Sequence, residues 1–221
     1  MAVKFGGREH SMRRNKESSI ELIKLMRERR SIRKYRSKPI SLQKVCQILE
    51  AGGYAPSGAN LQPWVYIIVT GEKIKKRIKE ECEKVDEKFH REAPEKIKAW
   101  LKEQGITPEK NFLMEAPVLV VVAAYTKAPY WLESTWISIA YILLSVQSRG
   151  LGTLTYTPSE TAFLNDLLDL PADYRAVAIL PIGYPAESPS SSMRPRKPLE
   201  QVVYLNRYGS ELKTYGKSGE V

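Results

Sequence analysis

The sequence predicts a domain of mixed helices and strands, of the α+β or the α/β class. Amphipathic helical patterns alternate loosely with short β-branched runs along the chain, and both classes share this arrangement. The 221 residues are enough for one good-sized hydrophobic core and do not require a second one. We therefore expect a single domain over residues 17–205, with a flexible leader at 1–16 and a C-terminal tail at 206–221.

The first third of the chain predicts two helices and a buried strand. Ser18 begins a capping box that opens the first helix. Ser41 caps a second helix, which ends at the glycine pair 52–53. The β-branched and aromatic run Trp64–Val69 follows, and it predicts a strand that is buried in the core.

Residues 71–112 differ in composition from the rest of the chain. A long helix is predicted over residues 72–91, with one apolar stripe and with Lys and Glu on almost every other position. A shorter helix follows at residues 95–104. This charged excursion interrupts two predicted strands, and long insertions of this kind are often lids over a binding site. We expect residues 71–112 to form a helical lid.

The second half of the chain combines three strands with one long helix. Residues Pro117–Tyr125 predict a second buried strand. Residues Trp131–Arg149 are apolar nearly all round, which predicts a central and fully buried helix. Two further strands are predicted at residues 151–156 and 176–182, with a short helix between them at 159–168.

The charge composition argues against a nucleic-acid-binding protein. The formal net charge of +10 would suit such a partner, but Lys and Glu are interleaved along the helices. This interleaving indicates solvated helix faces with ion pairs one turn apart, and we expect no nucleic-acid partner. Abundant Lys, Glu and Ile with few Asn and Gln are also typical of thermophile proteins.

The sequence gives little indication of a metalloprotein, a disulfide-rich protein or a membrane protein. The two cysteines, Cys46 and Cys82, and the two histidines leave almost no material for a disulfide framework, a zinc site or a Ser-His-Asp triad. The N-terminal residues are polar and do not read as a signal peptide, and the longest apolar run, Trp136–Val146, is too short to span a bilayer. We expect a cytoplasmic protein without a metal site.

The basic segment Arg29–Arg33 is the strongest functional signal, because three guanidiniums and a hydroxyl crowd into five residues. These cations repel each other unless an anion lies between them, and each charge-assisted hydrogen bond to a phosphate contributes about 1.5–3 kcal/mol. A solvated basic helix end explains the segment equally well, because cations are favoured there by the helix dipole. A second cationic segment, residues 194–199, would be explained if both segments met around one phosphate.

Four motifs in order resemble the FMN-dependent nitroreductase superfamily. They are Arg29–Arg33, Ala55–Trp64, Gly150–Thr153 and Leu180–Pro185. The resemblance extends over roughly residues 25–203, nearly the whole chain. Within the superfamily, Ser57–Ala59, Thr155–Pro158 and Arg196–Leu199 are most similar to the iodotyrosine deiodinase branch.

The resemblance implies an α+β, nitroreductase-like fold, with a mixed but mostly antiparallel sheet flanked by helices. It also implies an intertwined homodimer with two FMN sites at the subunit interface. The implied FMN contacts are Arg29, Arg30, Ser31, Arg33 and Arg196, with Thr155, Tyr156 and Thr157 along the isoalloxazine, and with Ser57 and Gly58 from the other subunit. A Thr157 hydroxyl near flavin N5 would favour one-electron steps over hydride transfer. The alternative is that Thr157 only begins the Pro158 turn, which is the commoner role for a threonine before proline on sequence alone.

The implied activity is reductive dehalogenation of halogenated tyrosine, with the reduced flavin stacked on the halophenolate and delivering electrons in one-electron steps. The backbone N–H of Ala59 would stabilise the phenolate oxygen, like an oxyanion hole. Asp86, His90 and Lys110 occupy the positions at which the branch binds the amino acid zwitterion, with Asp in place of Glu and His in place of Tyr.

Two alternatives remain open at this point. Glu87 or Arg91 could make the zwitterion contact instead, or the helix could be a solvated lid without such a contact. A general NAD(P)H-dependent nitroreductase or flavin reductase is the alternative function, because it needs only the FMN site. The electron donor is not indicated by the sequence.

Overall fold

The structure is a computed structural model that describes residues 21–186 and 195–211. Its contacts divide the chain into two units, Met1–Ser188 and Pro189–Val221. The predicted leader, residues 1–16, lies outside the described residues, as do residues 212–221 of the predicted tail. The single domain predicted over residues 17–205 includes parts of both units and stays a prediction.

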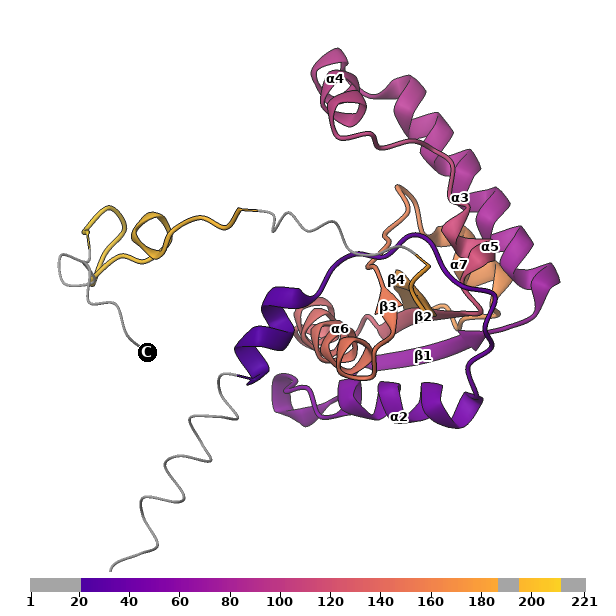
Figure 1. Ribbon diagram of the computed structural model, residues 1–221, viewed down its shortest axis with the longest axis horizontal. Helices are drawn as coiled ribbons and strands as arrows, with labels where there is room; N and C mark the ends of the chain where they lie inside the picture. The colour runs from indigo at the N-terminus through magenta and orange to yellow at the C-terminus, as the bar shows by residue number, and fades with distance from the viewer. Residues whose placement is uncertain (1–20, 187–194, 212–221) are drawn as a thin grey trace, which may run out of the picture. The chain divides into compact units, whose positions relative to one another are not determined.

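The first unit is built on a four-stranded antiparallel sheet with the strand order β1-β2-β4-β3 (Figure 1). The strands are β1 (Trp64–Val69), β2 (Val118–Tyr125), β3 (Gly152–Thr153) and β4 (Tyr174–Gly183). An isolated parallel bridge joins Ser31 to Thr153 at the β3 edge. The sheet is therefore mixed but mostly antiparallel, as expected.

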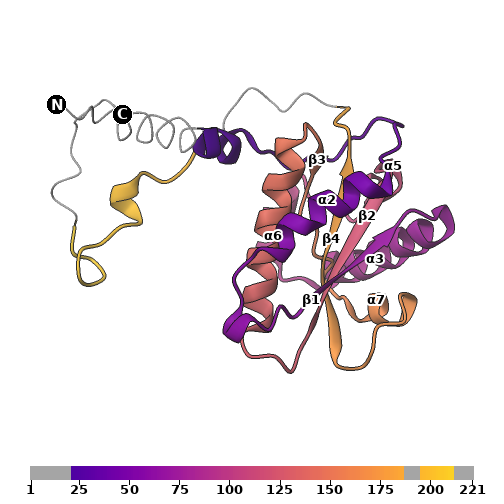
Figure 2. The ribbon, with the colours of Figure 1, turned by 90° about the horizontal axis from the view of Figure 1, so that it is seen from below.

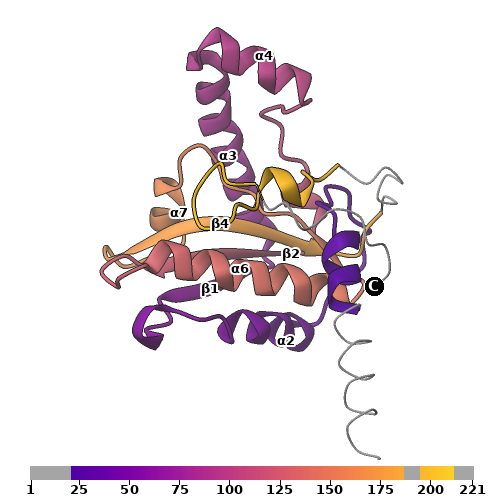
Figure 3. The same cartoon turned by 90° about the vertical axis from the view of Figure 1, so that its left-hand side faces the viewer.

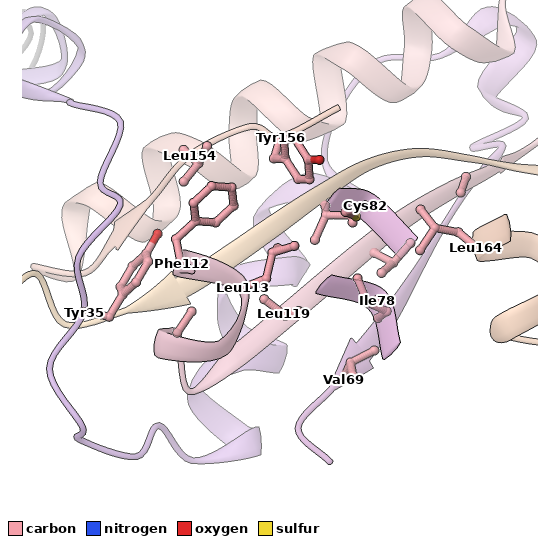
Figure 4. Close-up of a cluster of buried hydrophobic side chains, with 14 of the residues drawn as sticks. Tyr35, Val69, Ile78, Cys82, Phe112, Leu113, Leu119, Leu154, Tyr156 and Leu164 are labelled. Atoms are coloured by element: carbon pink, nitrogen blue, oxygen red, sulfur yellow. The ribbon is translucent and has the colours of Figure 1, made fainter. Parts of the chain in front are cut away.

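Helices cover both faces of this sheet (Figures 1 and 2). One face carries α2 (Leu42–Gly53) and α6 (Trp131–Ser148), and the other carries α3 (Glu72–Glu92), α5 (Phe112–Glu115) and α7 (Ala162–Leu167). The side chains of β2 alternate between the two resulting cores, because successive residues of a strand face opposite ways. Val118, Val120 and Val122 join the core under α2 and α6. Leu119, which is labelled in Figure 4, and Val121 join the other core.

The predicted lid region forms two helices, α3 and α4 (Glu95–Glu103). The half of α3 that begins at Glu72 packs on the sheet through Ile78 and Cys82, which are fully buried. Its other end, followed by α4, stands away from the sheet (Figures 1 and 3). The two predicted helices agree with the structure to within a residue at each end.

The predicted strand at residues 151–156 is only partly regular. Strand β3 ends at Thr153, but Tyr156 exchanges two backbone hydrogen bonds with Ile179 of β4, at 3.0 and 2.8 Å. The pairs Thr153–Ile182 and Tyr156–Ile179 belong to one antiparallel register, so the segment continues along β4 as an extended chain. This continuation carries the predicted flavin contacts.

The prediction that α6 is fully buried is wrong for its outer face. Ile139, Ile142 and Val146 lie in the core, but Leu132, Trp136, Ile137 and Tyr141 are each between a third and a half exposed. Within one chain α6 packs on the sheet and beside α2, and neither of these covers its outer side. Among the described residues, no helix combines the length and the apolar character that crossing a membrane requires.

The second unit is described from Pro195 to Glu211. It contains a short 3₁₀ helix, η2 (Leu199–Gln201), and an isolated antiparallel bridge between Tyr204 and Glu211. The Tyr204 ring also lies 4.7 Å from the Tyr208 ring, measured between centroids.

We expect the two adjacent glycines at the end of α2 to respond differently to alanine. A Cβ at Gly52 would lie 2.7 Å from both Ile142 Cγ1 and Tyr66 Oη, whereas a Cβ at Gly53 would meet nothing within 4 Å. Gly52→Ala should lower the free energy of unfolding by about 1–3 kcal/mol through overpacking. Gly53→Ala should leave it unchanged or raise it by up to about 1 kcal/mol. Urea unfolding of both variants measures this, and equal effects would contradict the packing described.

Candidate functional site

The basic segment lies along the outer edge of the sheet. After the helical residues 21–28, Ile32 donates its N–H to the Thr153 carbonyl at 3.0 Å, and Ser31 forms the parallel bridge to the same residue. This approach depends on Gly152, where a Cβ would lie 2.7 Å from Ile32 Cγ1. Ile32 is buried while Ser31 and Arg33 are exposed, so the segment anchors itself by Ile32 and presents a hydroxyl and a guanidinium outward.

The contacts of Arg30 agree in part with the alternative to a phosphate site, which was a basic helix end. Its Nη1 donates to the carbonyls of Arg27 and Arg29, at 3.0 and 3.2 Å, at the point where the first helix ends. These carbonyls are among those that a helix leaves unpaired at its C-terminus. A guanidinium has five N–H donors, so Arg30 can still bind an anion with the others.

The loop from Ser57 to Gln62 is strained and held by its own side chains. Ala59, Asn60 and Gln62 have left-handed φ angles of 49°, 55° and 45°, which cost a residue other than glycine about 1–3 kcal/mol each. The Gln62 N–H donates to Ser57 Oγ at 3.0 Å, and the Gln62 amide donates to Asn60. Strain of this kind persists where the surroundings enforce it, and it is typical of binding sites.

This loop forms the short 3₁₀ helix η1 (Gly58–Asn60) and leaves two donors for a ligand. The turn uses the N–H groups of Asn60 and Leu61, which donate to Ser57 and Gly58 at 3.0 Å each, and it does not use the Ala59 N–H. The Ser57 hydroxyl accepts its bond from Gln62, so its own proton can still be donated.

The loop and the basic segment lie at opposite ends of α6. A Cβ at Gly58 would lie 3.1 Å from the ring of Tyr130, the residue that precedes α6. Ser31 instead pairs with β3, which follows the other end of α6 and lies beside it (Figure 2). The 18 residues of α6 span about 27 Å, so one chain does not bring Ser57 next to Ser31.

The segment after β3 alternates in the direction of its side chains. Leu154 and Tyr156 point into the core under α3 (Figure 4), which places Thr155 and Thr157 on the opposite side. Thr157 is exposed and Thr155 is half-buried. The side chain of Tyr156, one of the predicted flavin contacts, is therefore directed into the core, and only its backbone lies beside the two threonines.

Tyr156 completes a buried polar network that the sequence did not reveal. Its hydroxyl donates to Asp86 Oδ2 at 2.9 Å, and the Ser159 N–H donates to Asp86 Oδ1 at 3.0 Å. Lys110 Nζ forms an ion pair with Asp86 Oδ2 at 3.0 Å. The exposed fractions are only 9% for Asp86 and 5% for Lys110. The structure thus brings together two predicted substrate contacts, but as partners of one another.

The network fixes the protonation states of its members. Burial alone would raise the pKa of Asp86, but the hydrogen bonds from Ser159, Lys110 and Tyr156 outweigh it and hold that pKa below its ordinary value. Burial raises the pKa of the Tyr156 phenol far above its usual range, and it raises the pKa of the neighbouring Cys82 thiol to about 12. Asp86 is therefore ionised, and the phenol and the thiol are neutral.

The remaining predicted contacts are not gathered at this network. His90 lies one turn beyond Asp86 on α3, partly exposed, with its ring edge-on to Phe89 at 6.2 Å. Glu87 and Arg91 are exposed on the same helix. Arg196 is exposed in the second unit, and the structure describes that unit by itself. Whether Arg196 reaches the basic segment stays a prediction.

Residues 26–184 match the nitroreductase family, and the chain belongs to that family. The iodotyrosine deiodinase of Thermotoga neapolitana is 35% identical over 182 residues, which cover 82% of this chain and 95% of the relative. The iodotyrosine deiodinase of Nematostella vectensis is 33% identical over 205 residues, which cover 86% and 76%. A crystal structure of oxidized iodotyrosine deiodinase bound to FMN and 3-iodo-L-tyrosine aligns with a TM-score of 0.76 at 34% identity, covering 86% of this chain and 99% of that one. The predicted family and fold are confirmed.

Asp86 should make the stability of the protein sensitive to acid. Its pKa is lower in the folded chain than the value of about 3.9 in an unfolded chain, so the folded protein binds fewer protons. The resulting stabilisation is fully present above the unfolded pKa, and it is lost as the pH falls from there through the folded pKa. We expect Asp86→Asn to lower the unfolding free energy by about 3 kcal/mol at pH 7, and by less at pH 3.

Urea unfolding between pH 7 and pH 3 measures this difference. The exposed Asp166 on α7 supplies the control, because Asp166→Asn should follow the wild-type curve. A constant difference between the wild type and Asp86→Asn at every pH would contradict the assignment.

Proposed function

We propose that this chain is an FMN-dependent reductive dehalogenase of halogenated tyrosines. The observation that carries the proposal is the joint placement of the basic segment and the Thr155–Thr157 segment on one strip at the β3 edge. Support also comes from two relatives, covered to 95% and 76% of their length, which are iodotyrosine deiodinases, and from the solved relative, which binds FMN and 3-iodo-L-tyrosine.

The residues along this strip fit FMN in chemical type and in order. Ser31 and Arg33 present a hydroxyl and a cation at one end, as a phosphate requires. Thr155 and Thr157 follow from the paired Thr153 and offer hydroxyl groups for the flavin ring. Arg29, Arg30 and Arg196 are the further cations that we assign to the phosphate end.

Reduced FMN, when bound, supplies the two electrons that replace a carbon–halogen bond by a carbon–hydrogen bond, with uptake of one proton and release of halide. The Thr157 hydroxyl would donate a hydrogen bond to flavin N5, and such a donor would favour electron delivery in single steps. The Ala59 N–H would donate to the phenolate oxygen of the substrate, and the Ser57 hydroxyl would donate to the flavin. The left-handed turn fixes both donors before the substrate arrives.

We further propose that the active form is a homodimer. Ser57 and the basic segment lie at opposite ends of α6, so a flavin held by both requires two chains. The outer face of α6 supports this assembly, because the exposed side chains Leu132, Trp136, Ile137 and Tyr141 are all apolar or aromatic. A surface of this kind is typical of a subunit interface.

A general NAD(P)H-dependent nitroreductase or flavin reductase is the second candidate. One observation favours it: Asp86 and Lys110, which the sequence assigned to an amino acid substrate, are already paired with each other. A reductase of this kind would need only the flavin strip. Rapid NADH oxidation with a nitroarene, without iodide release from 3-iodotyrosine, would support this candidate.

Iodide release is the first test. We expect the dithionite-reduced, FMN-loaded protein, mixed anaerobically with 3-iodotyrosine, to release one iodide for each flavin reoxidised. Ion chromatography measures the iodide and absorbance follows the flavin, with tyrosine as the unhalogenated control. Absence of both iodide and flavin reoxidation would contradict the proposal.

The Thr157 hydroxyl can be tested separately. Thr157→Ala should slow iodide release at least about tenfold, because one hydrogen bond to a reacting, charged group is lost. FMN should stay bound, because the contacts proposed for its phosphate are unchanged. Thr157→Ser, which keeps the hydroxyl, should recover most of the rate in rapid-mixing experiments. Equal rates in the alanine and serine variants would show that the hydroxyl has no such role.

Assembly can be tested on the face of α6. Ile137→Glu should convert a wild-type dimer into a monomer and release FMN, because it places a charge in the proposed interface. Ile74 on α3 is similarly exposed, 42% against 39% for Ile137, so Ile74→Glu should stay dimeric. Sedimentation equilibrium measures both. A monomeric wild type that keeps its FMN would contradict the proposal.

A further inference from the structure

A buried tyrosine lies two residues beyond the basic segment. Tyr35 is only 6% exposed, and it belongs to the core under α3 (Figure 4). Its ring lies close against the end of β4, because a Cβ at Gly183 would lie 2.5 Å from Tyr35 Cδ1. Any side chain at position 183 would therefore displace the ring. The position of Tyr35 is thus set by packing within the chain.

The backbone is paired on both sides of Arg33. Before it, the Ile32 N–H donates to the Thr153 carbonyl of β3. After it, two backbone hydrogen bonds of 2.9 Å each join residues 34–36 to residues 184–186, which follow β4. Arg33 lies between these two pairings, so its direction depends on what holds the peptide group that precedes it.

The Tyr35 hydroxyl holds this peptide group. It donates to the Ile32 carbonyl at 2.7 Å, and the Pro181 carbonyl of β4 lies 3.2 Å from the same oxygen. A phenol has one proton to donate, so the nearer Ile32 carbonyl is its main acceptor. Both contacts are buried. The hydroxyl therefore ties the basic segment to β4 from inside the protein.

This hydrogen bond fixes the orientation of Arg33. The Ile32 carbonyl and the Arg33 N–H belong to one peptide group, which is planar and trans. The two groups therefore point in opposite directions, and the Arg33 N–H is directed away from the Tyr35 hydroxyl. The same plane sets the position of the Arg33 Cα, from which the exposed side chain starts. Without the hydroxyl, the peptide group would be held less firmly, and the Ile32 carbonyl would lose a buried donor.

We infer that Tyr35 is a positioning residue for the cofactor: its hydroxyl orients the Ile32–Arg33 peptide, and through it Arg33, for the phosphate of FMN. This inference rests on the proposed function, in which Arg33 binds that phosphate. Tyr35 is buried, so it acts through Arg33 rather than by contact with the cofactor. Its contribution is preorganisation, because a cation that is already held in the bound geometry does not have to be ordered when the phosphate binds.

The inference is tested with Tyr35→Phe, which keeps the ring and removes only the hydroxyl. Flavin-stripped protein is titrated with FMN and with riboflavin, and flavin fluorescence gives the two dissociation constants. We expect the ratio of the riboflavin Kd to the FMN Kd to fall by about three- to tenfold, because one hydrogen bond no longer holds the phosphate contact in place. The riboflavin Kd itself should change by less than about twofold, because riboflavin has no phosphate for Arg33 to bind.

Tyr66→Phe is the matched control. The Tyr66 hydroxyl is bonded to Ser138 Oγ at 2.5 Å and packs against the other core, so this variant also loses a tyrosine hydroxyl that is bonded inside the protein. Its ratio should equal that of the wild type. An equal fall of the ratio in the two variants overturns the inference. So does a Tyr35→Phe variant in which both flavins lose affinity by the same factor, because a merely structural role would produce that result.

Action through Arg33 is tested by a double-mutant cycle. Arg33 is exposed, so Arg33→Met should fold and should by itself lower the ratio. Adding Tyr35→Phe to Arg33→Met should lower the ratio by less than about a further twofold, since the two residues act as one unit. Fully additive effects overturn the inference. Equal affinity of the wild type for the two flavins would instead overturn the phosphate site of the proposed function itself.

Discussion

The contact between the basic segment and β3 is the constraint on which the proposed site depends. Ile32 can reach the sheet only because residue 152 is glycine, and its N–H bond to Thr153 then fixes where Ser31 and Arg33 emerge. Beyond Thr153 the chain stays in the same register with β4 as far as the Tyr156–Ile179 bridge, which brings Thr155 and Thr157 to this edge. One short stretch of backbone pairing therefore sets the positions of both the cationic end of the strip and its hydroxyl groups.

The two cores differ in how completely their covering helices are buried. The core under α3 also contains Tyr156, so the lid and the segment after β3 share apolar packing as well as the polar network. In the core under α2 and α6, only the inner face of α6 is buried. The outer face of α6 stays partly exposed in a single chain. The strained loop at the start of α6 lies next to that face.

The sequence predicted the strands and the long helices well, because the spacing of apolar residues within each segment indicates its secondary structure. It did not predict burial and side-chain contacts that depend on segments distant in the sequence. The apolar character of α6 predicted complete burial, since a pattern does not distinguish a core from an interface. Ile78, Cys82 and Asp86 recur every four residues and share one inward face of α3, so the burial of Asp86 could be predicted from this spacing. No local pattern indicated that the Tyr156 hydroxyl would bond Asp86, and the assignment of Asp86 to a substrate stays a prediction.

In the proposed site, the segment beside β3 binds the phosphate of FMN. The most direct measurement is a titration of the flavin-stripped protein with FMN and with riboflavin, which lacks the phosphate, followed by flavin fluorescence. We expect one FMN to bind to each chain and riboflavin to bind at least about tenfold more weakly, because riboflavin cannot form the charged hydrogen bonds of the phosphate. Equal affinity for the two flavins, or no binding of either, would contradict it.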